Sequence, residues 1–136
     1  MNRKIVQIFF IGFLLLAVAG CAEKQDRTKK QRDLEFQVLS SEQTPRELGE
    51  LLEEKKKEGF KLTFTDEEML YICVGYGQQP TGGYSISVTE LYETENAVYV
   101  HTNLLGPSPG ELKKEKASYP YLVIRLEKQD KTVVFV

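Results

Sequence analysis

Near the N-terminus, apolar residues form an almost unbroken run from Ile5 to Ala17, preceded by Arg3 and Lys4. The run is too short for a comfortable membrane span, which needs about 20 apolar residues. Val18-Ala19-Gly20-Cys21 follows, with small side chains that let a peptidase approach the backbone. A basic start, a short apolar core and small residues at a cleavage point are the parts of a secretory signal. The pattern predicts an export signal over residues 1–20 rather than a short buried helix.

The segment from Ala22 to Asp33 has no apolar residue after its first and mixes both charges. Such a composition cannot bury enough apolar surface to order itself. We therefore expect residues 21–33 to form a flexible tether that reaches on the order of 20 Å as a coil. Periodic patterns begin at Leu34, and residues 34–136 are enough for one modest domain.

Within this domain the pattern first alternates and then becomes helical. Leu34 to Leu39 alternates apolar and polar residues, as a first strand would. Thr44-Pro45-Arg46-Glu47 offers a cap, a proline for the first helical position and a glutamate three residues after the cap. Leu48, Leu51 and Leu52 recur at helical spacing, and lysines and a glycine follow them. The pattern predicts one helix here.

Beyond Gly59 the period changes to two, which predicts a β-rich remainder. The expected strands cover Phe60 to Phe64, Met69 to Tyr76, a hairpin over residues 84–104, and a closing hairpin formed by Tyr121 to Leu126 and Thr132 to Val136. Leu91 shifts the alternation of the first hairpin, which indicates a bulge. The predicted fold class is α+β, mainly antiparallel β: a small β-sandwich or partly open barrel with one N-terminal helix.

Val18-Ala19-Gly20-Cys21 resembles the lipobox of bacterial lipoproteins, in which an aliphatic residue and two small residues precede a cysteine. In that family the cysteine thiol receives a diacylglycerol and the signal is cut before it. The resemblance implies lipidation of Cys21 with chains such as palmitate, and a lipid-anchored place on the extracytoplasmic face of the cell membrane. Two acyl chains would anchor the protein stably, since each buried CH₂ contributes roughly 0.8 kcal/mol.

The charge balance excludes one class of partner. Cleavage would remove two of the 18 basic residues and none of the 20 acidic ones, so the mature chain is acidic. It has no basic stripe, and we expect no nucleic-acid partner. The membrane, through Cys21, and a protein are the expected partners.

Residues that could support catalysis are few. His101 is the single histidine, and its neighbours Val100 and Thr102 place it on a strand opposite an apolar face. Cys73 lies in an apolar run and is read as a buried small hydrophobe. Asp66-Glu67-Glu68 could hold calcium, but a turn before a strand is the favoured interpretation because EF-hand spacing is missing. We expect no catalytic residue, no metal and no cofactor.

A glycine-flanked segment, Gly77-Gln78-Gln79-Pro80-Thr81-Gly82-Gly83-Tyr84-Ser85, joins two of the predicted strands. Pro80 suits the second position of a type I turn, with Gly82 closing it. Gly83 can adopt a positive φ before Tyr84 enters the next strand. The segment is either a plain hairpin loop or a binding loop. The candidate binding residues are Gln79, Pro80, Thr81, Gly82, Gly83 and Tyr84.

Val74-Gly75 together with Pro80-Thr81-Gly82-Gly83-Tyr84-Ser85-Ile86 resembles the family named for the C-terminal domain of PrcB, a protease complex subunit. The likeness extends to Gly106-Pro107-Ser108-Pro109-Gly110 and Ser118-Tyr119-Pro120-Tyr121, and covers about residues 60–136. It implies a small, mainly β domain on exported or lipid-anchored proteins, associated with stabilising or assembling a surface protease. It implies no catalytic residues.

A weaker likeness concerns chagasin-type inhibitors of cysteine peptidases, which carry an Asn-Pro-Thr-Thr-Gly-Tyr-like loop on an immunoglobulin-like sandwich. Residues 79–84 differ from that loop by Gln79 in place of Asn and Gly82 in place of the second Thr. The Arg-Pro-aromatic loop of those inhibitors is missing as well.

These observations lead to one preferred functional hypothesis and two alternatives. We expect a non-catalytic, lipid-anchored binding domain that assists or stabilises an exported protease by protein–protein contact. The first alternative is a chagasin-like peptidase inhibitor that uses residues 77–85. The second is a lipoprotein that binds a small ligand or an envelope glycan through tyrosine faces.

Overall fold

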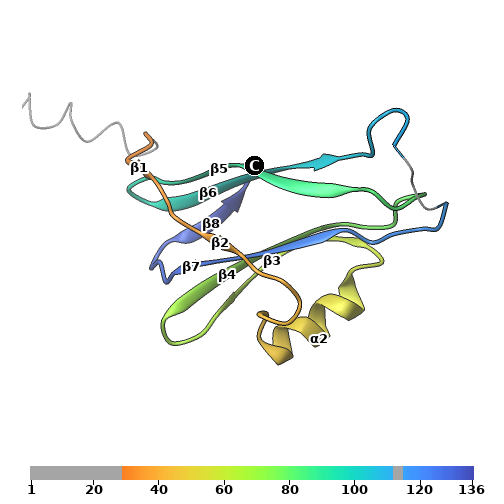
Figure 1. Cartoon of the computed structure of the whole chain (residues 1–136). Helices are drawn as coiled ribbons and strands as arrows, with labels where there is room; N and C mark the ends of the chain where they lie inside the picture. The colour runs from red at the N-terminus through yellow and green to blue at the C-terminus, as the bar shows by residue number, and fades with distance from the viewer. Residues whose placement is uncertain (1–28, 112–114) are drawn as a thin grey trace, which may run out of the picture.

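The computed structural model describes residues 29–111 and 115–136 of the 136-residue chain. Two four-stranded sheets pack face to face, and one helix covers the outer face of the second sheet (Figure 1). The predicted signal and Cys21 lie outside the described residues. None of the helices within 29–111 and 115–136 is long and apolar enough to cross a membrane.

The sheets are mainly antiparallel and do not close into a barrel. The first contains, in spatial order, β1 (Arg32–Asp33), β5 (Ser85–Glu93), β6 (Ala97–Leu105) and β8 (Thr132–Phe135). The second contains β2 (Gln37–Val38), β7 (Tyr121–Glu127), β4 (Met69–Tyr76) and β3 (Gly59–Thr65). Only β6 and β8 pair in parallel among the described strands. The α+β sandwich prediction is confirmed, and the barrel alternative is not.

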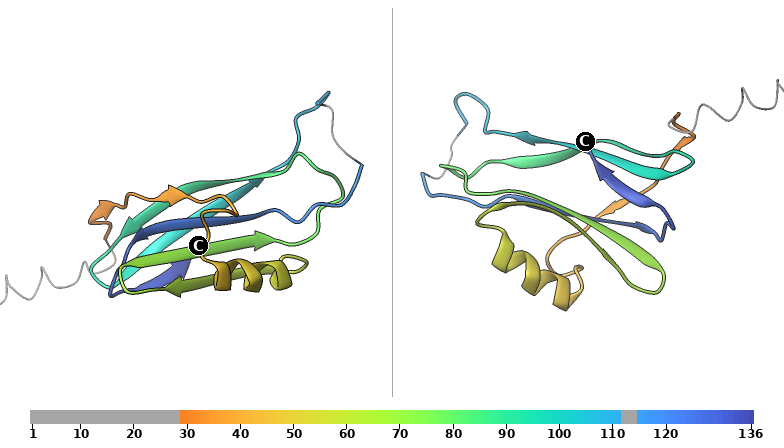
Figure 2. Two further views of the ribbon diagram at one scale, coloured as in Figure 1. Left: turned by 60° about the horizontal axis from the view of Figure 1, so that its bottom comes forward. Right: turned by 180° about the vertical axis from the view of Figure 1, so that it is seen from behind.

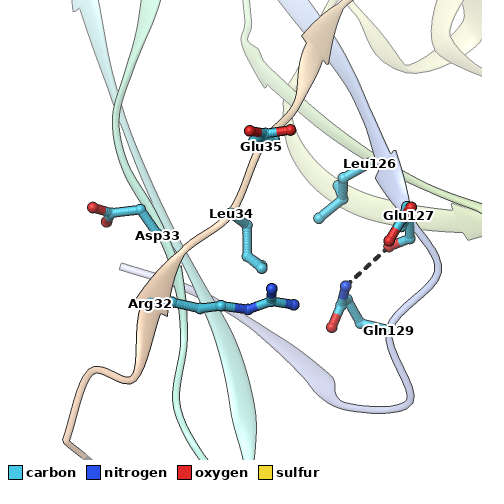
Figure 3. Close-up of a pocket in the computed structure, with 7 residues that line it drawn as sticks. All are labelled: Arg32, Asp33, Leu34, Glu35, Leu126, Glu127 and Gln129. Atoms are coloured by element: carbon cyan, nitrogen blue, oxygen red, sulfur yellow. Dashed lines mark hydrogen bonds between the residues drawn. The ribbon is translucent and has the colours of Figure 1, made fainter.

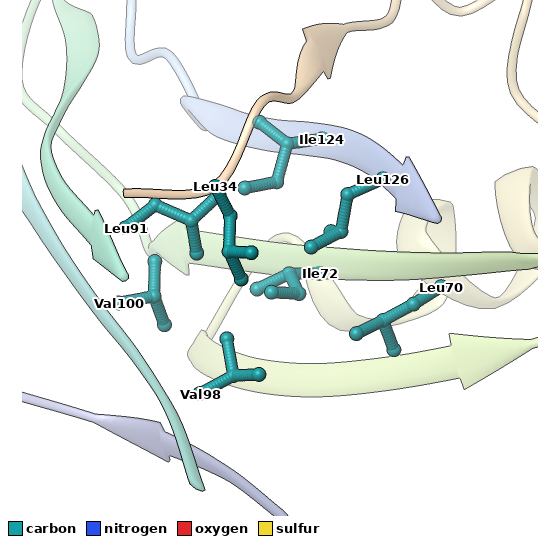
Figure 4. Close-up of a cluster of buried hydrophobic side chains, with 8 residues drawn as sticks. All are labelled: Leu34, Leu70, Ile72, Leu91, Val98, Val100, Ile124 and Leu126. Carbon is teal, nitrogen blue, oxygen red and sulfur yellow. The ribbon is translucent and has the colours of Figure 1, made fainter. Parts of the chain in front are cut away.

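Strand β4 explains how the layers are held together. Leu70 and Ile72 point toward the first sheet, whereas Tyr71 and Cys73 point toward the helix. A strand covered on both faces needs apolar residues at every position, which is why its sequence lacks alternation. The core between the sheets consists of Leu34, Leu70, Ile72, Leu91, Val98, Val100, Ile124 and Leu126 (Figure 4).

Helix α2 (Arg46–Lys55) occupies the predicted place but begins differently. Pro45 is its N-cap, and no side chain caps the first turn. The hydroxyl of Thr44 instead donates to the Ser40 carbonyl at 2.9 Å, so the predicted capping box is wrong. Because Thr44 is held in the preceding turn, its oxygen cannot serve the helix.

The N-terminal segment forms two short strands in different sheets, not the single strand predicted for residues 34–39. Strand β1 pairs with β5, and the chain then crosses to pair β2 with β7. Leu34 is buried, but Phe36 is 40% exposed and Val38 is 53% exposed. The alternation did not correspond to a single strand with one buried face, because the segment changes from the first sheet to the second between β1 and β2. Ordered structure also begins before Leu34, since Arg32 lies within the expected tether and in β1.

The hairpin of β5 and β6 is confirmed, including a bulge between Val88 and Glu90. The predicted closing hairpin is wrong. Strand β7 lies between β2 and β4, so both of its edges are occupied, and β8 crosses to the first sheet. There it pairs in parallel with β6, from Ala97 opposite Thr132 to Val100 opposite Phe135.

Glu93 ties three segments together at the end of the sandwich where the described chain begins. The Nε of Arg32 and the Nζ of Lys131 both donate to its carboxylate, the latter at 3.2 Å. Lys131 also donates to the carbonyl of Thr94 at 2.7 Å. The hydrogen bonds from Arg32 and then Lys131 hold the pKa of Glu93 below its ordinary value of 4.5.

Glu93→Gln should lower the melting temperature at neutral pH and flatten its acid dependence. A depressed pKa contributes stability above the ordinary value, and this stability is lost as the pH falls through the folded-state pKa. Melting curves between about pH 7 and about pH 3 should show a smaller acid loss in the variant than in the wild type. Glu95→Gln, an exposed change in the same turn, is the control. Equal acid losses in Glu93→Gln and the wild type would contradict the assignment.

Candidate functional site

The candidate binding loop lies at the end of the sandwich opposite to β1. Strand β1 pairs at Glu93, the last residue of β5, whereas residues 77–84 precede Ser85 at its other end. The connection from β6 to β7 reaches the same end (Figure 2). We call the group of residues 77–84, 106–111 and 115–120 the loop end.

Backbone hydrogen bonds join the two connections of the loop end. Gln79 and Ser118 form an isolated antiparallel bridge, with N···O distances of 2.8 and 3.0 Å. The hydroxyl of Ser118 donates to the carbonyl of Thr81 at 2.7 Å. Because the Gln79 carbonyl accepts from Ser118, the loop is held by a neighbouring segment. Residues 80–82 form bends, and no backbone hydrogen bond from Gly82 to Gln79 closes the predicted type I turn.

Glycines allow the loop end to pack closely. Gly83 has a φ of 86°, as predicted, and a Cβ built there would lie 3.0 Å from the ring of Pro107. Gly106 in turn lies beneath the ring of Tyr84, where a Cβ would meet Cε1 at 3.4 Å. The Tyr84 side chain is half-buried and therefore supports the loop.

Two of the candidate binding side chains, those of Gln79 and Thr81, already have internal partners. The side-chain amide of Gln79 donates to the backbone carbonyl of Tyr76 at 3.2 Å, and the hydroxyl of Thr81 donates to the backbone carbonyl of Gly82 at 3.0 Å. Both side chains are half-buried, whereas Pro80 is exposed. The loop is thus pre-shaped, and partner contact through these residues stays a prediction.

Sequence reasoning missed two supports of the loop end. The sequence did point to Ser118, because it belongs to the Ser118-Tyr119-Pro120-Tyr121 motif of the family resemblance. Its hydrogen bond to the carbonyl of Thr81, 37 residues away, could not be predicted from sequence spacing. No feature of the sequence pointed to Tyr76. Its hydroxyl lies 2.7 Å from the hydroxyl of Thr102, which links β4 of one sheet to β6 of the other.

The other residues considered for chemistry are dispersed. Cys73 is completely buried, and burial raises the pKa of its thiol to about 12. His101 is half-buried and faces the hydroxyl of Thr89 on the neighbouring strand. Asp66 accepts from the backbone N–H groups of Glu68 and Met69, at 3.0 and 2.8 Å, which is a turn. In the part of the chain that the structure describes, no three His, Cys, Asp or Glu side chains could together hold a metal ion.

A hollow of about 270 Å³ opens at the end opposite to the loop end (Figure 3). It is lined by Arg32, Asp33, Leu34, Glu35, Leu126, Glu127 and Gln129. Arg32 is already bound to Glu93, and the remaining charged groups are carboxylates. The lining therefore offers no convergent set of groups for an anion or for acid–base chemistry.

The fold and the loop end define a small β-sandwich domain whose β4–β5 and β6–β7 connections are bound into one surface. Residues 70–127 match the family model described as PrcB C-terminal, which spans β4 to β7 and the whole loop end. This segment of the chain belongs to the PrcB C-terminal family, as the resemblance predicted. No curated protein and no solved structure matches the chain.

Proposed function

We propose that this protein is a non-catalytic, lipid-anchored binding domain on the extracytoplasmic face of the cell membrane. Its loop end contacts an exported protease and stabilises it or assists its assembly. Cys21 carries the lipid, and the tether of mixed charge separates the domain from the bilayer. No cofactor, metal or nucleic acid takes part.

One observation carries this proposal: the segments that resemble the family pattern gather at a single end of the sandwich. Residues 80–84 and Ser118 are joined by hydrogen bonds, and Gly83 packs on Pro107. That end lies opposite to β1, where the chain arrives from Cys21. A lipid at Cys21 would therefore attach the domain by the end opposite to the loop end. A rigid loop loses little entropy on binding, which favours recognition.

The full chain with a photo-crosslinking amino acid at Thr81 should form an adduct with an exported protease in membranes of the native cell. The same probe at Asn96, in an exposed turn at the other end, should not. Adducts identified by mass spectrometry would name the partner. Crosslinking from Asn96 alone, or to proteins that are not proteases, would contradict the proposal.

Gln79→Ala combined with Thr81→Ala should weaken this capture while lowering the melting temperature only slightly. Each change removes one hydrogen bond of a half-buried side chain, which costs about 0.5 kcal/mol because water can replace the lost partner. Glu95→Ala with Asn96→Ala is the matched control, since both residues are exposed in the opposite turn. Gly83→Val should instead damage stability, because a β-branched residue resists positive φ. Undiminished capture by the double variant would place the binding surface elsewhere.

Removal of the chain separates the preferred function from the alternatives. A stabilising partner predicts less protease and less activity in cells that lack the chain. A peptidase inhibitor predicts more activity at an unchanged amount of protease. A thermal shift with envelope glycan and no change in the protease would favour the ligand-binding alternative.

A further inference from the structure

One edge of the first sheet is left open along about two thirds of strand β5. Strand β1 covers β5 only at Tyr92 and Glu93, and the N–H of Leu34 donates to the Leu91 carbonyl at 3.0 Å. The stretch Ser85–Glu90 has no strand on this side in the part of the chain that the structure describes. Unpaired backbone groups on a sheet edge are a template for another strand.

The edge of β5 is open because the N-terminal segment pairs with it only briefly, through β1. After Leu34 the chain crosses to the second sheet, where β2 pairs with β7. The crossing leaves a shallow groove of about 570 Å³ beside β5. Its lining consists of Lys30, Asp33, Leu34, Phe36, Val88, Thr89, Glu90, Leu91 and Tyr92.

The groove combines apolar and acidic groups. Phe36 is 40% exposed on one side, and the half-buried Val88 lies on the other. Lys30 is bound to Asp33 at 2.6 Å, so its charge is already balanced. The Glu90 carboxylate has no ion-pair partner within 4.0 Å in residues 29–111 and 115–136. The free charge of the groove is therefore negative.

We propose that the Ser85–Glu90 edge binds an extended segment of another protein as an added antiparallel strand. The segment continues the line of β1 and places apolar side chains against Phe36 and Val88. A lysine or arginine of the segment pairs with Glu90. Main-chain hydrogen bonds then supply affinity, and alternate side chains supply specificity. This site is separate from the loop end and needs neither the lipid nor a protease partner.

A short synthetic strand tests this site on the full mature chain in detergent. The probe is a blocked peptide of alternating valine and threonine with one lysine, supplied at millimolar concentration. Hydrogen–deuterium exchange should slow about tenfold in Ser85–Glu90 and stay unchanged in the loop end. A peptide of the same composition with a central proline should give no protection, because proline lacks the N–H that a strand donates. Absence of protection by the first peptide would overturn the proposal.

Two variants assign the recognition to particular side chains. Phe36→Ser should weaken binding at least fivefold, whereas Leu51→Ser, at a leucine of similar exposure on α2, should not change it. Glu90→Lys should weaken binding of the lysine peptide and strengthen binding of a glutamate version. If the free chain is a dimer with Ser85–Glu90 already protected, a second copy fills the groove and the proposal is wrong. Peptide binding that is unchanged in both Phe36→Ser and Glu90→Lys would also contradict the proposal.

Discussion

Cys21→Ala should abolish fatty-acid labelling of the chain and release it from the membrane fraction. The thiol is the group that accepts the diacylglycerol in the lipobox resemblance, and alanine offers no nucleophile in its place. Two acyl chains supply most of the anchoring free energy, so their loss leaves only a tether of mixed charge. Labelling of growing cells followed by membrane fractionation measures both effects.

Cys73→Ala provides the matched control for this experiment. Cys73 is the other cysteine of the chain, and it is completely buried between β4 and α2. Its burial keeps the thiol away from lipid transfer, so labelling should persist in this variant. Label that survives Cys21→Ala, or a cytosolic wild-type chain, would contradict the lipoprotein assignment.

Leu52→Ala should destabilise the domain by about 2–5 kcal/mol, the range for deleting a buried leucine side chain. Leu52 is completely buried in the layer between α2 and the second sheet, next to Leu48 and Cys73. The cost is a large share of the about 5–15 kcal/mol that stabilises a typical domain. We therefore expect the melting temperature to fall by more than about 10 °C.

Leu51→Ala separates packing from helix propensity in the same turn. Leu51 is 36% exposed, so its truncation should cost less than about 1 kcal/mol. Combining Leu52→Ala with Leu48→Ala should unfold the helix layer, since both of its fully buried leucines are then lost. Chemical denaturation monitored by circular dichroism gives the free energies. Similar losses at Leu51 and Leu52 would show that α2 is not anchored as described.

The type and the approximate bounds of the elements with a local periodic pattern could be predicted from the sequence itself. The alternation of Phe60, Leu62 and Phe64 predicted β3, and the apolar run from Met69 predicted the buried β4. The hairpin of β5 and β6 was also evident, together with its bulge, because short-range pairing and the phase of side chains suffice to specify it. The positive φ of Gly83 followed from the same kind of local argument.

The tertiary structure decided how distant segments pair. The pattern of β7 and β8 is compatible with a hairpin, but β7 is enclosed by β2 and β4, so β8 joins the other sheet. Leu34 and Phe36 alternate as one strand would, yet the chain changes sheets between β1 and β2. Such choices depend on which edge is free once the other strands are in place, and no local pattern records that.

The candidate binding loop shows the same division. Its residues and its glycine geometry were readable from the sequence, as was the family to which residues 70–127 belong. Its attachment to Ser118, and the open edge of β5 beside Phe36, arise only when segments far apart in the chain meet. Long-range hydrogen bonds and a strand that leaves its sheet have no periodic signature, so the structure alone could reveal them.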